Sequence, residues 1–233
     1  DFRFIWRRRR YPRRENDAAA ALAAIAAATH DHAARAALSA LVESYGSQFA
    51  LAGFQVAAAA RILAGFDGTH SIATLVSAGT GSGKTLAFYL PALSRVASHI
   101  QRDAAAARWV KVLALYPRNE LLKDQFAEVY GQARRLDATF AARGRRKILI
   151  GTFFGPTPHS AEKAHEARSG WRPTSQGLVC EYLRCPAPGC DGDMAWRDAD
   201  RRASRERLEC LECLATIESD EIILTRARLQ SDL

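Results

Sequence analysis

The sequence lacks the features of a membrane-spanning or secreted chain. No stretch approaches the ~18 consecutive apolar residues that a transmembrane helix requires, and the alanine-rich run Asp17–Ala28 is too short and too weakly hydrophobic. The N-terminus has neither an initiator methionine nor a signal-peptide core. We therefore expect no membrane partner, and we expect a chain that begins inside a longer protein.

Cysteine is absent before Cys180, and all five cysteines lie between Cys180 and Cys213. Disulfide-stabilised domains spread their cysteines along the chain, whereas metal sites gather them. This distribution predicts a reducing compartment, the cytoplasm, and a local metal site.

Acidic residues are too few to balance the basic ones. The 233 residues carry a formal charge of +8 and have a pI near 9.6, which favours a polyanionic partner, nucleic acid before an anionic membrane surface. Arginines concentrate at Arg7–Arg10 and at Arg13-Arg14. This basic segment is either a solvated tail or an arm that contacts phosphates.

The apolar residues, 48% of the chain, follow a pattern typical of α/β proteins. Alanine-rich residues 17–45 predict two helices broken near Thr29–His32, and a third helix is expected over about 55–63. Continuous apolar runs then alternate with helical segments, which predicts parallel strands covered on both faces. The expected strands are residues 72–77, 110–116 and 147–154, and the expected helices are residues 84–97 and 119–135.

A glycine-rich loop follows the first expected strand and opens a helix, the context that a phosphate-binding loop requires. Glycines permit positive-φ turns and keep side chains out of the way, so backbone N–H groups can converge on phosphates. Lys84 would neutralise β- and γ-phosphate charge, and the Thr85 hydroxyl would ligate Mg²⁺. The nucleotide-binding residues are Ala78, Gly79, Thr80, Gly81, Ser82, Gly83, Lys84 and Thr85, with Ala78 at the position of the usual glycine.

This loop resembles motif I of the superfamily 2 helicases of the DEAD/DEAH-box type. In that family a glutamine upstream reads the adenine edge, and the resemblance gives Gln55 this role, although an exposed helical residue is the plainer interpretation. Leu113–Gln125 is similar to motif Ia, in which a strand ends at proline and the next helix meets the nucleic-acid backbone. The resemblance implies nucleic-acid contacts by Pro117, Arg118 and Asn119.

Residues 148–158 are similar to the strand and Gly-Thr-Pro turn that follow motif Ia in several of these helicases, which would place Gly155 and Thr157 beside the strand-binding channel. Hydrolysis in the family needs an Asp-Glu motif II and an arginine finger from a second RecA-like domain. Asp220-Glu221 is the only Asp-Glu pair, and we reject it because no buried apolar strand precedes it. We expect the isolated chain to bind ATP and Mg²⁺ without hydrolysis.

Two short-spaced cysteine pairs predict a zinc ribbon. Cys185 and Cys190 enclose proline and glycine, Cys210 and Cys213 follow further on, and such pairs suit tetrahedral Zn²⁺. Cys180 has the same spacing to Cys185, but it lies in an apolar stretch typical of a core. The segments 193–196 and 207–209 would form a hairpin between the pairs. Whether the ribbon is structural or grips nucleic acid stays open, since it carries Arg197, Arg201, Arg202, Arg205 and Arg207.

Together these features predict an α/β chain with an incomplete, parallel-sheet RecA-like domain, N-terminal helices and a zinc-ribbon insertion. The expected divisions are residues 1–49, 50–176, 177–219 and 220–233. The favoured function is an ATP-dependent helicase or translocase that uses ATP, Mg²⁺ and Zn²⁺ and acts on DNA rather than RNA. The alternatives are a P-loop motor of another class and an inactive zinc module that binds nucleic acid. Residues 116–125 with the Gly-Thr-Pro turn resemble helicases of bacterial DNA-modification and phage-defence gene clusters, so other subunits of such a system are candidate partners.

Overall fold

The computed structural model describes residues 11–79, 81–102, 108–166 and 170–232. The chain divides into two compact units, Asp1–Arg102 and Asp103–Leu233. The arginine run Arg7–Arg10 lies outside the described residues. Among the residues that are described, no helix has the length and apolar character needed to cross a membrane.

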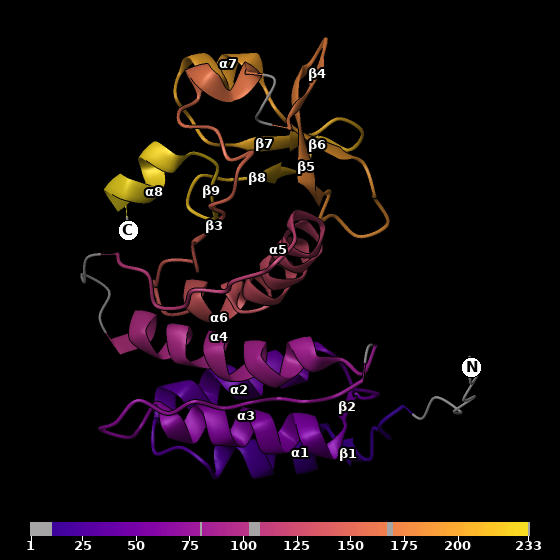
Figure 1. Cartoon of the computed structure of the whole chain (residues 1–233), viewed down its shortest axis with the longest axis vertical. Coiled ribbons are helices and arrows are strands. Elements are labelled where there is room, and N and C mark those ends of the chain that lie inside the picture. Colours follow the sequence, from indigo (N-terminus) through magenta and orange to yellow (C-terminus); the bar gives the residue numbers. More distant parts are fainter. Residues whose placement is uncertain (1–10, 80, 103–107, 167–169, 233) are drawn as a thin grey trace, which may run out of the picture. The chain divides into compact units, whose positions relative to one another are not determined.

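The first unit is a packed group of four helices with a short antiparallel strand pair (Figure 1). The break predicted near Thr29–His32 separates the first two helices, and Asp17 caps the first by accepting a hydrogen bond from Ala20 N at 2.8 Å. Alanine predominates where helices approach closely, and the larger buried side chains include Leu38, Leu41 and Leu63. The elements are β1 (Asn16–Asp17), α1 (Ala18–Ala26), α2 (His32–Ser44), β2 (Ala50–Leu51), α3 (Gly53–Gly65) and α4 (Lys84–Arg102).

Asp31 joins the start of α2 to α4. It caps α2 through Ala34 N at 3.1 Å, accepts a hydrogen bond from Ser98 Oγ at 2.6 Å, and pairs with Arg95 at 2.9 Å and Arg102 at 2.8 Å. Burial raises the pKa of Asp31, but the hydrogen bonds and the two arginines outweigh burial and hold that pKa below its ordinary value. The buried carboxylate is therefore a charged anchor for α4, the helix that follows the glycine-rich loop.

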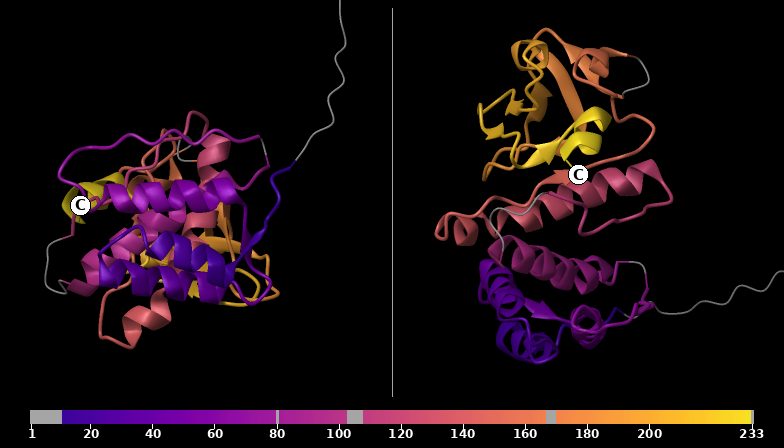
Figure 2. Two further views of the ribbon diagram at one scale, coloured as in Figure 1. Left: turned by 90° about the horizontal axis from the view of Figure 1, so that it is seen from below. Right: turned by 90° about the vertical axis from the view of Figure 1, so that its left-hand side faces the viewer.

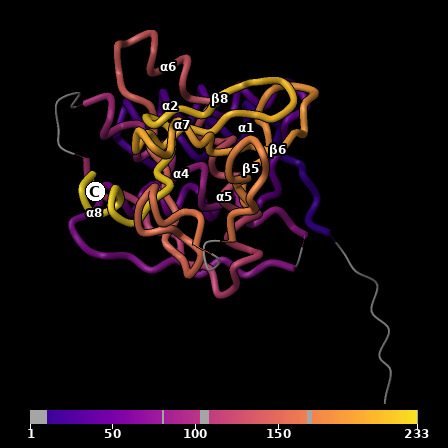
Figure 3. The backbone as a smooth tube through the Cα atoms, turned by 90° about the horizontal axis from the view of Figure 1, so that it is seen from above, coloured from indigo at the N-terminus to yellow at the C-terminus, as the bar shows by residue number. Residues whose placement is uncertain are grey.

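The second unit combines a five-stranded antiparallel sheet, in the order β4-β5-β6-β7-β8, with a separate parallel pair β3–β9. Figure 3 shows β5 and β6 side by side, as their antiparallel register requires. The helices of this unit are α5 (Asn119–Arg134), α6 (Asp137–Ala141), η1 (Glu162–His165), α7 (Asp198–Arg202) and α8 (Arg226–Asp232). Its strands are β3 (Ile150–Gly151), β4 (Arg172–Thr174), β5 (Gly177–Arg184), β6 (Asp193–Trp196), β7 (Leu208–Cys210), β8 (Thr216–Ile217) and β9 (Ile222–Ile223).

Aromatic side chains lie at the centre of a buried cluster in the second unit. The Tyr182 ring on β5 makes edge contacts with Phe126 of α5, with Phe154 and with Trp171, at centroid distances of 5.1, 6.1 and 6.0 Å. Trp171 also packs on Trp196 of β6 at 5.6 Å. The cysteine-bearing sheet is thus packed directly on α5 and on the residues that follow β3.

A buried carboxylate fixes the chain after β9 to the same sheet. Glu206 accepts a hydrogen bond from Leu224 N at 2.7 Å and pairs with Arg228 of α8 at 3.1 Å. Figure 2 shows α8, in yellow, directly after this strand. The end of the described chain is therefore part of the unit's packed structure.

The mixed α/β class and the hairpin between the cysteine pairs are confirmed, since β3 and β9 are parallel and β6 pairs with β7. Two expected strands are wrong. Residues 72–77 and 110–116 have no regular secondary structure, and Leu75 and Leu113 are 96% and 75% exposed. A strand needs a neighbour for its backbone hydrogen bonds, and these segments have none among the described residues. The third expected strand is reduced to Ile150–Gly151, and the expected domain divisions stay a prediction.

We predict that Asp31→Asn destabilises the first unit by about 2 kcal/mol at neutral pH, because asparagine keeps the helix cap but loses the charged hydrogen bonds. The pKa of Asp31 is lower in the folded state, so its contribution is complete above the unfolded pKa of about 3.9 and disappears as pH falls through the folded value. Urea denaturation followed by circular dichroism at neutral and acid pH measures this difference.

The matched control is Asp198→Asn, which removes a half-exposed carboxylate paired with Arg201 at 2.7 Å. Such a solvent-exposed pair contributes about 0–1 kcal/mol. A loss for Asp31→Asn that equals the control, or that stays constant down to pH values below the folded pKa, would contradict the anchoring role.

Candidate functional sites

The glycine-rich loop has the backbone that a phosphate site needs. Gly81 and Gly83 have φ values of +77° and +80°, in the left-handed region that favours glycine. Lys84, the first residue of α4, donates from Nζ to the carbonyl oxygens of Ala78 at 2.7 Å and Gly79 at 2.8 Å. The Ser82 hydroxyl is buried and has no hydrogen-bond partner among the described residues. A lysine held by two exchangeable carbonyls and an unpaired buried hydroxyl fit a phosphate group.

Gln55 is fully buried, and both ends of its amide have partners. Its Oε1 accepts from Ala52 N at 2.8 Å, and its Nε2 donates to Gly83 O at 2.7 Å. The interpretation of Gln55 as an exposed helical residue is therefore wrong. In this structure the side chain ties the start of α3 to the phosphate loop, and contact with adenine would require it to exchange these partners.

Other residues complete the description of the loop. Thr80 lies outside the described residues, and Thr85 is the second residue of α4 and is half-buried. Arg14 was not predicted to lie here: its Nη2 is 3.8 Å from the point where a Cβ on Gly83 would stand. The sequence marks Arg14 only as part of a basic segment that is either a solvated tail or an arm that contacts phosphates.

The motif Ia residues lie at the exposed start of α5. Arg118 is the N-cap residue, its side chain makes no capping hydrogen bond, and Asn119 is the first helical residue. Pro117, Arg118 and Asn119 are all exposed. The first N–H groups of a helix have no intrahelical acceptor and attract anions, so this end of α5 suits a phosphate.

The turn Gly155-Pro156-Thr157-Pro158, which resembles the family's Gly-Thr-Pro turn, follows β3 and is held by hydrogen bonds. Gly155 is exposed, whereas Thr157 is buried, with its Oγ1 accepting from Phe154 N at 3.1 Å and donating to Thr152 O at 3.2 Å. Thr157 thus stabilises the turn from inside. Arg226, which sequence reasoning missed, donates to the carbonyl oxygens of Phe154, Gly155 and Thr157 from the start of α8.

The pair Asp220-Glu221 serves a different purpose from a catalytic motif. Glu221 is buried and accepts a hydrogen bond from the Tyr130 hydroxyl at 2.6 Å, and it also pairs with Lys147 and with Arg134. Both acids precede β9, whereas open parallel sheets bind ligands beyond the carboxyl ends of their strands. The structure therefore agrees with the rejection of this pair as motif II.

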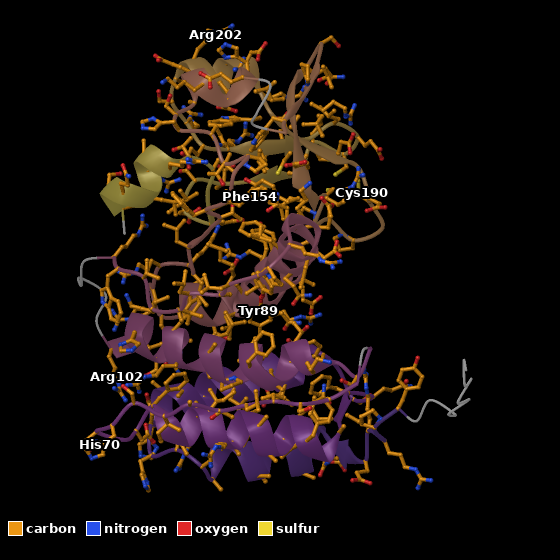
Figure 4. All side chains as sticks on the ribbon, in the orientation of Figure 1. His70, Tyr89, Arg102, Phe154, Cys190 and Arg202 are labelled. Atoms are coloured by element: carbon orange, nitrogen blue, oxygen red, sulfur yellow. The ribbon has the colours of Figure 1, made fainter. Side chains whose placement is uncertain are left out.

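Four cysteines converge at the turns that follow strands β5 and β7 of the antiparallel sheet. The Sγ atoms of Cys185, Cys190, Cys210 and Cys213 all lie within 4.8 Å of one another, with Cys185 to Cys213 at 3.4 Å and Cys190 to Cys210 at 3.7 Å. Sulfurs bound at about 2.3 Å to a tetrahedral Zn²⁺ would stand about 3.8 Å apart. Figure 4 shows Cys190 on the loop after β5. The donor set and its spacing fit Zn²⁺.

Backbone N–H groups donate to the sulfurs of Cys185 and Cys210, although burial raises the pKa of the Cys185 thiol to about 12. Ala187 N donates to Cys185 Sγ at 3.4 Å, and Glu212 N donates to Cys210 Sγ at 3.4 Å. Burial raises the pKa of Cys210, but donors from Cys213 and Glu212 outweigh burial and lower that pKa to about 7. A Cβ on Gly192 would stand 2.8 Å from Cys210 Sγ, so this position requires glycine.

Cys180 lies apart from this cluster, inside the core on β5. Burial raises the pKa of its thiol to about 12, and its sulfur is not among the four that converge. The structure thus separates the two cysteines between which spacing alone could not decide.

The arginines of the ribbon mostly pair with carboxylates of the same module. Arg202 is exposed on α7 (Figure 4) and has no ion pair among the described residues. The other four arginines each pair with a carboxylate: Arg197–Glu209 at 2.8 Å, Arg201–Asp198 at 2.7 Å, Arg205–Asp200 at 3.6 Å and Arg207–Glu218 at 3.0 Å. This pairing favours the structural interpretation of the ribbon over a nucleic-acid grip.

Comparison with known proteins agrees with the sequence motifs. The DEAD/DEAH box helicase family matches residues 53–149. The chain is also 28% identical over 106 residues to the Druantia protein DruE of Escherichia coli (strain UMEA 4076-1), a match that covers 44% of this chain and 6% of that protein. No solved structure matches the chain. These matches confirm the resemblance to DEAD/DEAH-box helicases over residues 53–149. The chain spans only a small part of its relative's length.

We predict one Zn²⁺ per chain, bound by the four converging cysteines. Cys213→Ser should abolish metal binding, because Cys213 is an exposed member of the cluster and its replacement leaves the core intact. Elemental analysis of the purified variants measures the metal content directly.

Cys180→Ala is the matched control, since it removes a thiol of the same chain without placing a polar group in the core. It should keep the metal. Loss of zinc from Cys180→Ala with unchanged circular dichroism, or its retention in Cys213→Ser, would show that the ligand set is wrong.

Proposed function

We propose that this chain is the ATP-binding and nucleic-acid-binding front portion of an ATP-dependent helicase or translocase. The observation that carries the proposal is the phosphate loop at the start of α4, within the segment that matches the DEAD/DEAH box helicase family. The residues proposed to hold the nucleotide are those of the loop, Ala78 to Thr85, with Gln55 at the adenine.

Each part of the loop has a chemical task in this proposal. Lys84 would leave the carbonyls of Ala78 and Gly79 and pair with the β- and γ-phosphates, which are stronger acceptors because they are charged. The Thr85 hydroxyl would ligate the Mg²⁺ that accompanies the nucleotide. The metal would neutralise phosphate charge, as it does in other P-loop enzymes.

The nucleic-acid side of the proposal rests on the second unit. Arg118 and Asn119 stand at an uncapped helix start, and Gly155 lies exposed on a rigid turn after β3. The formal charge of +8 suits a polyanion. A transport ATPase needs no exposed arginine and asparagine at such a helix start, which favours a nucleic-acid motor over other P-loop motors.

The zinc ribbon would stabilise this unit. The ribbon strand β5 packs through Tyr182 on Phe126 of α5, and Glu181 pairs with Lys123 of α5 at 2.8 Å. Zn²⁺ would join the turn between β5 and β6 to the turn between β7 and β8. The metal would therefore support α5 through the sheet on which this helix packs.

We further propose a role in a bacterial defence or DNA-modification system, with DNA as the substrate. This proposal is supported by the resemblance of residues 116–125 and the Gly-Thr-Pro turn to helicases of such gene clusters. The match to the Druantia protein DruE agrees with it.

We predict that Lys84→Ala weakens ATP binding by about 10- to 100-fold, the effect of losing a hydrogen bond between charged groups. Titration with a fluorescent ATP analogue in the presence of Mg²⁺ measures the dissociation constants. In the same titration, Gln55→Ala should lose any preference for ATP over GTP.

Lys163→Ala is the control for loss of one positive charge, since Lys163 is an exposed residue of η1. It should bind the analogue as the wild type does. Equal affinities of the wild type and Lys84→Ala would refute the assignment of the phosphate loop.

A further inference from the structure

Phe153 is an exposed aromatic residue in an otherwise buried segment. Its side chain is 68% exposed, whereas its neighbours Thr152 and Phe154 are 5% and 9% exposed. Figure 4 shows Phe154 in the interior of the second unit. Phe153 follows β3 closely, so it stands at the carboxyl end of the parallel pair β3–β9, the edge at which parallel sheets bind ligands. A single exposed ring is common on protein surfaces, so its surroundings decide whether it marks a site.

The backbone around Phe153 is fixed by contacts from distant residues. Arg226 donates from Nε to Thr157 O at 2.9 Å, and from Nη2 to Phe154 O at 3.0 Å and Gly155 O at 2.8 Å. Its backbone N–H also donates to Pro158 O at 2.9 Å. The turn is therefore ordered before any ligand arrives, which lowers the entropic cost of binding.

Arg226 also places a positive charge beside the exposed ring. Its Cζ atom is 5.1 Å from the Phe153 ring centroid. Among the described residues, Nη1 of Arg226 has no hydrogen-bond acceptor, although Nε and Nη2 are occupied. An aromatic face and a guanidinium edge with unused N–H groups thus lie next to each other.

This pair of groups matches the two parts of a nucleotide. Any base can stack on an aromatic ring, and an adjacent phosphate is the anion that a guanidinium binds most specifically. Bases inside a duplex are already stacked on each other, so a protein ring reaches them only in a single strand. An apolar protein partner would have no use for the arginine.

We propose that Phe153 and Arg226 form a stacking site for one nucleotide of a single-stranded nucleic acid. The base stacks on the Phe153 ring, and the neighbouring phosphate accepts hydrogen bonds from Nη1 of Arg226. The site rests on the proposed function, because it specifies the form of nucleic acid that the second unit binds. It adds an aromatic contact to the polar contacts of Arg118 and Asn119.

Fluorescence anisotropy with labelled oligothymidylate and oligouridylate tests the site. Phe153→Ala should weaken binding by about 5- to 100-fold, the usual effect of losing one base–aromatic stack. Phe153→Leu should lose nearly as much affinity for the oligonucleotides, because leucine keeps an apolar surface but has no aromatic face. Phe153→Trp should bind at least as tightly as the wild type. An abasic oligonucleotide should bind the wild type and Phe153→Ala equally.

Phe66→Ala is the matched control. Phe66 is a partly exposed ring with Arg95 Cζ 6.0 Å from its centroid, but it lies at the end of α3 opposite to the phosphate loop. This variant should bind oligonucleotides as the wild type does, and circular dichroism should show that all variants are folded.

Three results would overturn the stacking site: unchanged affinity in Phe153→Ala, full affinity in Phe153→Leu, or equal loss in Phe66→Ala. Failure of the wild type to bind any oligonucleotide is a different outcome. That outcome would contradict nucleic-acid binding itself and with it the proposed function. The assignment of the phosphate loop is tested separately, by the loss of ATP binding in Lys84→Ala.

Discussion

A phosphate loop must hold its backbone open around a space that no side chain fills, and this constraint governs the first unit. The loop meets it with positive φ angles at Gly81 and Gly83, and Ser82 N donates to Gly79 O across it at 3.3 Å. Its shape is also maintained by neighbours. Gln55 binds Gly83 O from α3, and Lys84 binds two loop carbonyls from α4.

The two helices that supply these contacts must themselves be held. Asp31 fixes α4 to the start of α2 through Ser98 and two arginines, and the carboxylate is charged at neutral pH because those partners outweigh its burial. Polar and charged contacts thus hold α4 at both ends, through Lys84 at its start and through Asp31 near its end. The second unit uses a different means, since aromatic contacts around Tyr182 pack the cysteine-bearing sheet on α5 and on the turn after β3.

Sequence patterns with a local physical cause predicted the structure well. Helices expected to begin near Gln55, Lys84 and Asn119 are present at residues 53–65, 84–102 and 119–134, and four cysteines with paired spacing converge as expected. Properties that depend on distant partners were not predictable. The apolar runs at residues 72–77 and 110–116 resemble strands, but a strand exists only where a second backbone pairs with it. Arg226 is an ordinary helical arginine in the sequence. Its contact with the turn after β3 appears only in the fold, because Thr157 lies 69 residues earlier in the chain.

We propose that this chain supplies the nucleotide-binding loop and part of the nucleic-acid contacts of one motor. The test is release of inorganic phosphate from ATP by the full-length protein that contains this sequence, with and without single-stranded DNA or RNA. If the proposal holds, release is slow for the protein alone and strongly stimulated by single-stranded nucleic acid. Phosphate release that is unaffected by nucleic acid would contradict it and would favour a P-loop motor of another class.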